Sequence, residues 1–125
     1  SANELSHLVH TSNMPFALDG KIFDGPLYLG KDKLPTSAGI ALICTEAGEG
    51  VKIMSILCGD NLESVITGSP KNDCWKKHAY HGRVDVYVYT KESTAKEREE
   101  YCRKVLDRDR KWMFCEEAPK IEDDF

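Results

Sequence analysis

Two apolar runs near the middle of the chain constrain its fold more than any other feature. The first, Gly39–Cys44, is a compact apolar segment, and the second, Val51–Cys58, begins with alternating side chains. Gly48 and Gly50 lie between the runs, and glycines in so short a connection are typical of a tight turn. The pattern therefore predicts a central β-hairpin.

A third strand and a long helix are predicted after this hairpin. Residues Val84–Tyr89 are β-branched and aromatic, apart from Asp85, as is common in strands. Thr94 and Glu97 form a capping box for the final helix. Its apolar side chains recur at spacings of three and four, so one helical face should pack on the sheet. These side chains belong to Tyr101, Cys102, Val105, Leu106, Trp112 and Met113.

Shorter elements are predicted between these segments. Asn61 can cap a helix that ends near Ile66, and Asp73 can cap a second helix from Cys74 to about Tyr80. We expect Trp75 and Trp112 both to anchor helices onto the sheet.

The N-terminal region predicts a β-ribbon. Asp19-Gly20 is a strong hairpin signal, and it is flanked by the candidate strands 16–18 and 21–23. Residues 3–10 predict a short helix. Residues 1–38 are therefore treated as an N-terminal extension of a core domain that spans residues 39–115.

The composition indicates one folded domain in a cytoplasmic protein. The chain has 125 residues, of which 41% are hydrophobic. Its apolar stretches are too short to span a membrane, and its start lacks a secretory pattern. Residues 116–125 contain five acids and one base, which account for the formal net charge of −4 and predict a flexible acidic tail. The five cysteines cannot all pair within the chain, so we expect reduced, partly buried thiols.

Local basic clusters are the candidate nucleic-acid contacts, although the body of the chain is neutral overall. The first cluster contains Lys71, Lys76, Lys77 and Arg83. A second cluster lies on the final helix, where interleaved acids favour a mixed, solvated surface.

The order of these elements resembles the GIY-YIG nuclease superfamily between Gly39 and about Phe114. Gly39-Ile40-Ala41 is similar to the family's first motif, and Gly59-Asp60-Asn61-Leu62 is similar to the turn that enters its first helix. Residues 73–78, with the sequence DCWKKH, are similar to a DCWKRH-type segment of some members. The resemblance implies an α/β fold of the α+β sandwich type, with a small three-stranded antiparallel sheet flanked by helices.

The catalytic positions of the family are largely not matched. The resemblance implies two tyrosines, an arginine on the first helix and a metal-binding glutamate on a later helix. The tyrosines fall at Ala41 and Ser55, and the helix after Asn61 carries Glu63 but no base. Glu99 is the best remaining metal-binding acid, although a solvated residue in the first turns of a helix is the simpler interpretation.

Three alternative interpretations remain open beside this alignment. In a rival alignment, Leu27-Tyr28-Leu29-Gly30 matches the family's second motif, but that alignment also supplies no arginine. Separately, Cys74, His78 and His81 are potential zinc ligands within eight residues, with no obvious fourth ligand. A nucleophilic pair of Cys58 or Cys44 with His78 lacks an orienting third group.

Three functions are therefore compared. The favoured hypothesis is a non-catalytic GIY-YIG-like binding module for nucleic acid or a protein partner. The second is an endonuclease that hydrolyses phosphodiesters with Mg²⁺ or Mn²⁺ and has rebuilt its catalytic site around Glu99, Tyr87 and His78. The third is a small zinc-binding protein that uses Cys74, His78 and His81. The sequence leaves the oligomeric state open and predicts no membrane partner.

Overall fold

The computed structural model describes residues 16–116. It opens with a hairpin of β1 (Phe16–Leu18) and β2 (Lys21–Tyr28). The turn residues Asp19 and Gly20 have φ values of 47° and 83°. This left-handed pair fits the twist of a two-residue hairpin, and the predicted β-ribbon is confirmed. The helix predicted for residues 3–10 lies outside the described residues.

The central hairpin is also confirmed. Strand β3 (Gly39–Ala47) pairs in antiparallel fashion with β4 (Gly50–Gly59) along the whole length of β3. Gly48 in the turn has a φ of 61°, which favours glycine. The pairing register shifts between Ile43 and Cys44, where β4 contributes one extra residue.

The sheet has five strands in the order β1-β2-β5-β3-β4, with every pair antiparallel. The prediction of an α/β fold is confirmed, and the prediction of three strands is wrong. Strand β5 (Asp85–Tyr89) pairs with β3 on one side and with β2 on the other. A three-stranded sheet would leave the outer edge of β5 unpaired, and the N-terminal ribbon supplies the missing partner.

Within residues 16–116, three α-helices accompany the sheet. These are α2 (Leu62–Thr67), α3 (Asn72–His78) and α4 (Ala95–Asp109). The caps predicted at Asn61 and Thr94 are present, the latter as a full capping box. The cap predicted at Asp73 is wrong, because the N-cap residue is Lys71 and makes no side-chain cap. Short 3₁₀ helices, η2 and η3, lie at Tyr80–Gly82 and Arg110–Trp112.

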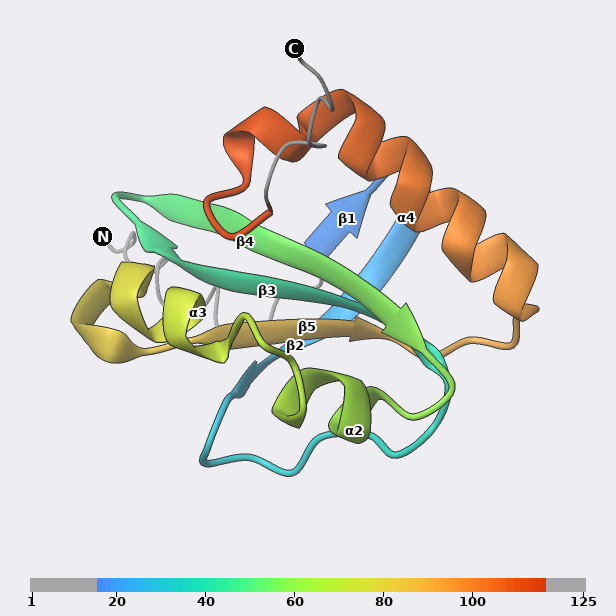
Figure 1. Ribbon diagram of the computed structural model, residues 1–125, viewed down its shortest axis with the longest axis horizontal. Coiled ribbons are helices and arrows are strands. Elements are labelled where there is room, and N and C mark those ends of the chain that lie inside the picture. The colour runs from blue at the N-terminus through green and yellow to red at the C-terminus, as the bar shows by residue number, and fades with distance from the viewer. Residues whose placement is uncertain (1–15, 117–125) are drawn as a thin grey trace, which may run out of the picture.

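The sheet lies between two helical layers (Figure 1), with α4 on one face and α2 and α3 on the other. Side chains of β3 are buried on both faces from Gly39 to Thr45. Trp75 is fully buried below the sheet, where its Nε1 donates a 2.9 Å hydrogen bond to Oγ of Ser55. The apolar stripe predicted on α4 packs on the opposite face through Tyr101, Cys102 and Val105.

The segment after α4 crosses the outer edge of β4. Met113 belongs to the core under α4, whereas Cys115 belongs to the core of the other face. The chain turns here, because the backbone N–H of Glu116 donates to the carbonyl of Met113 at 3.2 Å, and the backbone N–H of Cys115 donates to the carbonyl of Met54 at 3.0 Å. Trp112 and Phe114 alternate with the buried residues and are exposed. The prediction that Trp112 anchors a helix is therefore wrong, because α4 ends at Asp109 and the helical spacing no longer applies.

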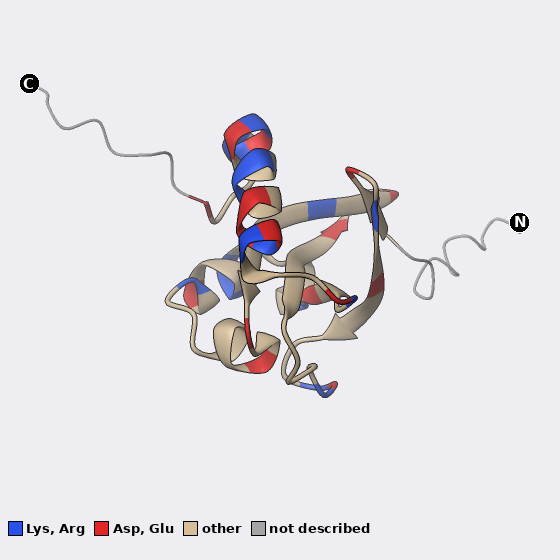
Figure 2. Ribbon diagram, turned by 90° about the vertical axis from the view of Figure 1, so that its right-hand side faces the viewer, with Lys and Arg blue, Asp and Glu red and all other residues tan. Residues whose placement is uncertain are grey.

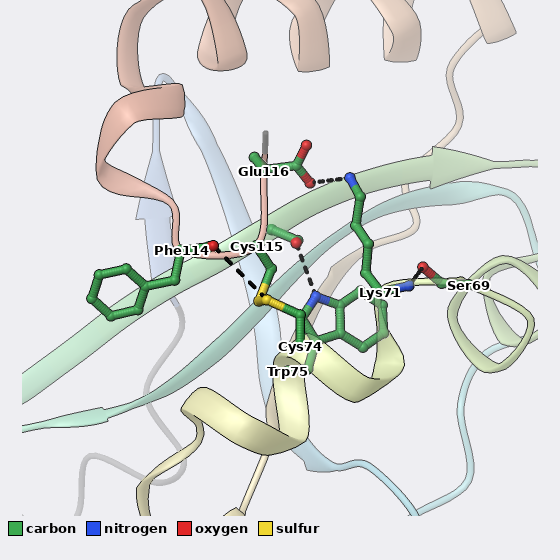
Figure 3. Close-up of a disulfide and its surroundings, with 8 residues drawn as sticks. Ser69, Lys71, Cys74, Trp75, Phe114, Cys115 and Glu116 are labelled. Atoms are coloured by element: carbon green, nitrogen blue, oxygen red, sulfur yellow. Dashed lines mark hydrogen bonds and ion pairs between the residues drawn. A yellow bond between two sulfur atoms is a disulfide. The ribbon is translucent and has the colours of Figure 1, made fainter. Parts of the chain in front are cut away.

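A disulfide fixes this crossing segment to α3 (Figure 3). Cys74 bonds to Cys115 with their Cα atoms 5.9 Å apart, and Lys71 forms a 2.7 Å ion pair with Glu116 beside it. The expectation that every thiol is reduced is wrong for this pair. Forty-one positions separate the two cysteines, and only the tertiary fold brings them together.

Within the described residues, no helix has both the length and the apolar character needed to cross a membrane.

We expect the two tryptophans to differ sharply in their effect on stability. Trp75→Ala should lower the free energy of unfolding by about 3–5 kcal/mol, because it empties a buried site and leaves the Ser55 hydroxyl unpaired. Trp112→Ala should change it by no more than about 0.5 kcal/mol, because that side chain is 67% exposed. Denaturant midpoints of both variants check this; equal losses would contradict the packing described.

Loss of the Cys74–Cys115 disulfide should lower the free energy of unfolding by about 2–4 kcal/mol, because it frees a long loop in the unfolded chain. The variant Cys74→Ser/Cys115→Ser should match the reduced wild-type protein in chemical denaturation. Its own midpoint should not respond to dithiothreitol, which serves as the internal control. A wild-type midpoint insensitive to reduction would contradict a stabilising disulfide.

Candidate functional site

The three candidate catalytic residues lie apart. Tyr87 is buried in the core under α4, while His78 is exposed on α3 at the opposite face of the sheet. Burial raises the pKa of Tyr87 to about 12, which opposes its use as a proton acceptor. Glu99 is exposed on the solvent side of α4, and Arg98 takes the buried position beside it. The structure therefore does not assemble these three side chains into one site.

The candidate zinc ligands are not assembled either. The sulfur of Cys74 is bonded to Cys115, so it is not available as a thiolate. The ring of His78 packs against Phe114, and the ring of His81 packs against Tyr80. Among residues 16–116, no three His, Cys, Asp or Glu side chains converge to hold a metal ion.

The predicted basic cluster divides into two pairs. Lys71 is bound to Glu116, and Arg83 lies over the ring of Tyr28 within 4 Å of two carboxylates. Lys76 and Lys77 are exposed in the last turn of α3 and form no ion pair with any residue in the range 16–116. On α4, acidic and basic residues alternate along the helix, as Figure 2 shows.

The two positions that the predicted resemblance would align with nuclease tyrosines are closed to solvent. Ala41 and Ser55 are fully buried, and the indole of Trp75 covers Ser55. Helix α2 begins at Leu62 beside them and carries Glu63 but no basic residue. This face of the sheet is a packed core that has no room for a substrate.

Exposed apolar and lysine side chains gather at one place, here called the aromatic–lysine surface, which is formed by Val51, Lys52, Lys111, Trp112 and Phe114. Trp112 is 67% exposed and Phe114 is 49% exposed. These five residues line a groove of about 330 Å³ at the edge of the sheet, together with parts of β1 and β4. Large apolar side chains exposed together in this way usually mark an interaction site.

The backbone conformation of the crossing segment makes the rings of Trp112 and Phe114 face outward. Trp112 ends the 3₁₀ helix η3, and Phe114 lies in the turn closed by the hydrogen bond from Glu116 to Met113. In this conformation Met113 and Cys115 are buried, whereas Trp112 and Phe114 are exposed. The disulfide and the hydrogen bond to Met54 hold this segment in place (Figure 3). The rings are therefore presented from a fixed backbone.

Each ring of the surface has a cation beside it. Nζ of Lys111 lies 5.3 Å from the centroid of the Trp112 ring, and Nζ of Lys52 lies 4.4 Å from that of Phe114. Among residues 16–116, the only acid that lines the groove is Asp109, which accepts a 2.6 Å hydrogen bond from Arg108. That guanidinium lowers the pKa of Asp109 and offsets its charge. The groove thus combines exposed aromatic rings with net positive charge.

The helical spacing in the sequence predicts a buried Trp112, and no motif singles out Phe114. No periodic signal indicates this surface, because Trp112 ends a 3₁₀ helix and Phe114 lies in a turn.

A buried carboxyl lies elsewhere in the sheet, on β5. Asp85 is 4% exposed, and its Oδ1 accepts no hydrogen bond from any described residue. Nε of Arg83 is 3.8 Å from that oxygen, which is an ion pair without a hydrogen bond. Burial raises the pKa of Asp85, and the charge of Arg83 only partly opposes this shift.

No family model matches this chain, and no match is found among curated proteins or solved structures.

Asp85 should make stability fall as the pH rises. Its folded-state pKa is raised, so the folded protein holds the proton more tightly than the unfolded chain, whose aspartate titrates near about pH 3.9. The stability contribution is present below that pH and is lost as the pH passes through the raised folded pKa. Asp85→Asn should therefore be stabilising relative to wild type at pH 7, and the difference should shrink toward pH 4.

Denaturation of both proteins from pH 4 to 7 measures this difference. Asp107→Asn, at an exposed position on α4, is the control and should keep the wild-type pH dependence. Parallel curves for Asp85→Asn and wild type would contradict the assignment.

Proposed function

We propose that this protein is a non-catalytic, GIY-YIG-like binding module that holds single-stranded nucleic acid on the aromatic–lysine surface. The single observation that carries the proposal is the pair of exposed rings, Trp112 and Phe114, each with a lysine ammonium within about 5 Å.

The chemistry of the surface favours a single strand over a duplex. Unpaired bases can stack on exposed aromatic rings, whereas paired bases in a duplex are already stacked on one another. Lys52 and Lys111 can contact phosphates while the rings contact bases. Lys76 and Lys77 lie on α3 together with His78, whose ring centroid is 5.4 Å from that of Phe114. These cations extend the positive charge beyond the groove.

The arrangement of the core supports a non-catalytic role. In the proposed alignment, Ala41 and Ser55 replace the two tyrosines of the nuclease family, and both are buried, Ser55 in a hydrogen bond with Trp75. The antiparallel strands β5, β3 and β4 with helices on both faces are compatible with the small sheet that the resemblance implies. The binding surface is on the outer edge of β4, away from those positions.

Single-stranded DNA and RNA should bind the full chain at low salt, and Trp112→Ala or Phe114→Ala should weaken binding at least about fivefold, since each stacked base contributes about 1–3 kcal/mol. Lys52→Ala and Lys111→Ala should each reduce the slope of log affinity against log salt by about 0.7. Fluorescence anisotropy of labelled oligonucleotides measures both effects.

Two substitutions serve as matched controls. Tyr80→Ala removes an aromatic ring of similar exposure, 57%, that does not line the groove. Lys96→Ala removes a lysine from the first turn of α4. Both should bind as wild type does.

Three outcomes would overturn the proposal. The first is no retention of either nucleic acid at low salt. The second is retention of a polyglutamate peptide through Trp112 and Phe114 without retention of nucleic acid, which would indicate an acidic protein partner. The third is cleavage with Mg²⁺ or Mn²⁺ that Glu99→Ala abolishes, which would restore the endonuclease hypothesis.

A further inference from the structure

Two free cysteines face each other between α4 and β4, away from the aromatic–lysine surface. Cys58 lies near the end of β4, and Cys102 lies on α4. Both side chains pack in the core between helix and sheet, where the two thiols are neighbours. Cys58 is partly exposed, whereas Cys102 is buried. A reagent in solvent should thus reach Cys58 more readily than Cys102.

A buried arginine lies beside this pair. Arg98 precedes Cys102 by one helical turn and is only 6% exposed. It donates 2.6 Å and 3.1 Å hydrogen bonds to the carbonyl of Ser93 and to the carboxylate of Asp60. Asp60 lies two residues after Cys58 and is itself exposed. The guanidinium is therefore held close to the Cys58 sulfur.

The two thiols differ in acidity. The hydrogen bond from Cys102 lowers the pKa of Cys58 to about 7, and the positive charge of Arg98 assists. Burial and the carboxylates of Glu99 and Asp60 oppose this shift without cancelling it. The pKa of Cys102 is raised, because its proton is shared with Cys58 and its side chain is desolvated. Cys58 is thus the nucleophile, whereas the buried Cys102 thiol keeps its proton.

We propose that Cys58 and Cys102 are a redox-active dithiol that a low-molecular-weight disulfide converts to an intrachain disulfide. The Cys58 thiolate attacks one sulfur of the oxidant, forms a mixed disulfide and releases one thiolate. Cys102 then gives its proton to that thiolate or to water and attacks the Cys58 sulfur, which releases the second thiolate. Two protein thiols lose two electrons in total, and the oxidant becomes two thiols.

The other cysteines take no part in this chemistry. Cys44 is fully buried, and desolvation raises its pKa, so it is an inert core thiol. Cys74 and Cys115 are already bonded to each other. The five cysteines thus comprise one structural disulfide, one inert thiol and one reactive pair.

Oxidised glutathione is the probe, used on the full chain with its structural disulfide intact. Wild type should fall from three free thiols to one, and peptide mapping should find Cys58 linked to Cys102. Cys102→Ser should stop at a mixed disulfide with one glutathione on Cys58. Cys58→Ser should gain no adduct, because its remaining thiols are buried.

The pH dependence of Cys58 alkylation gives an independent measurement in the Cys102→Ala and wild-type proteins. Wild type should react with iodoacetamide with a midpoint near pH 7, and removal of the Cys102 proton donor should move that midpoint upward. At pH 7 the wild-type rate should exceed that of an ordinary exposed cysteine roughly threefold, because a larger thiolate fraction outweighs its lower nucleophilicity.

Several results would overturn the proposal. Wild type could keep all three free thiols under excess oxidised glutathione, or the new disulfide could map to Cys44. Cys102→Ser could fail to trap glutathione while far-ultraviolet circular dichroism shows that it is folded. A Cys58 midpoint near pH 9 that is the same with and without Cys102 would also exclude the reactive pair.

Discussion

The fold depends on the burial of β3 on both faces. Every side chain from Ile40 to Thr45 is withdrawn from solvent, so the sheet is stable only when a layer covers each side. Trp75 and the residues of α2 cover one face, and α4 covers the other. The segment that contains Met113 and Cys115 contacts both cores and passes over the edge of β4. The aromatic–lysine surface lies where this segment crosses β4, so its geometry also depends on the burial of β3 on both faces.

Local chemistry predicted much of the fold. Asp19-Gly20 specified a hairpin, because both residues adopt left-handed backbone angles there. Thr94 and Glu97 specified the start of α4 through two reciprocal hydrogen bonds. These signals act within a few residues, so they can be found without knowledge of the rest of the chain. The pairing of β5 with β2 could not be predicted from such local signals, because the paired residues are about sixty positions apart in the sequence.

The aromatic–lysine surface could not be predicted from local sequence signals. Trp112 has the spacing of the apolar stripe on α4, and only the end of that helix at Asp109 places it in solvent. Lysine and aromatic residues on separate elements, such as Lys52 and Phe114, meet only after the chain crosses β4. The partnership of Cys74 with Cys115 rather than with Cys58 or Cys102 likewise follows from tertiary packing. The irregular spacing of the five cysteines in the sequence does not indicate which of them pair.

The crossing segment also has a consequence for folding during synthesis. A ribosome releases the chain from its N-terminus, and the ribbon, the central hairpin and α2 emerge well before residue 113. Neither hydrophobic core is complete until Met113 and Cys115 arrive, and Cys74 has no disulfide partner until then. The nascent protein must therefore carry an open edge on β4 from the time that strand is made until residues 113–115 are made. Folding is finished by the part of the domain that is made last.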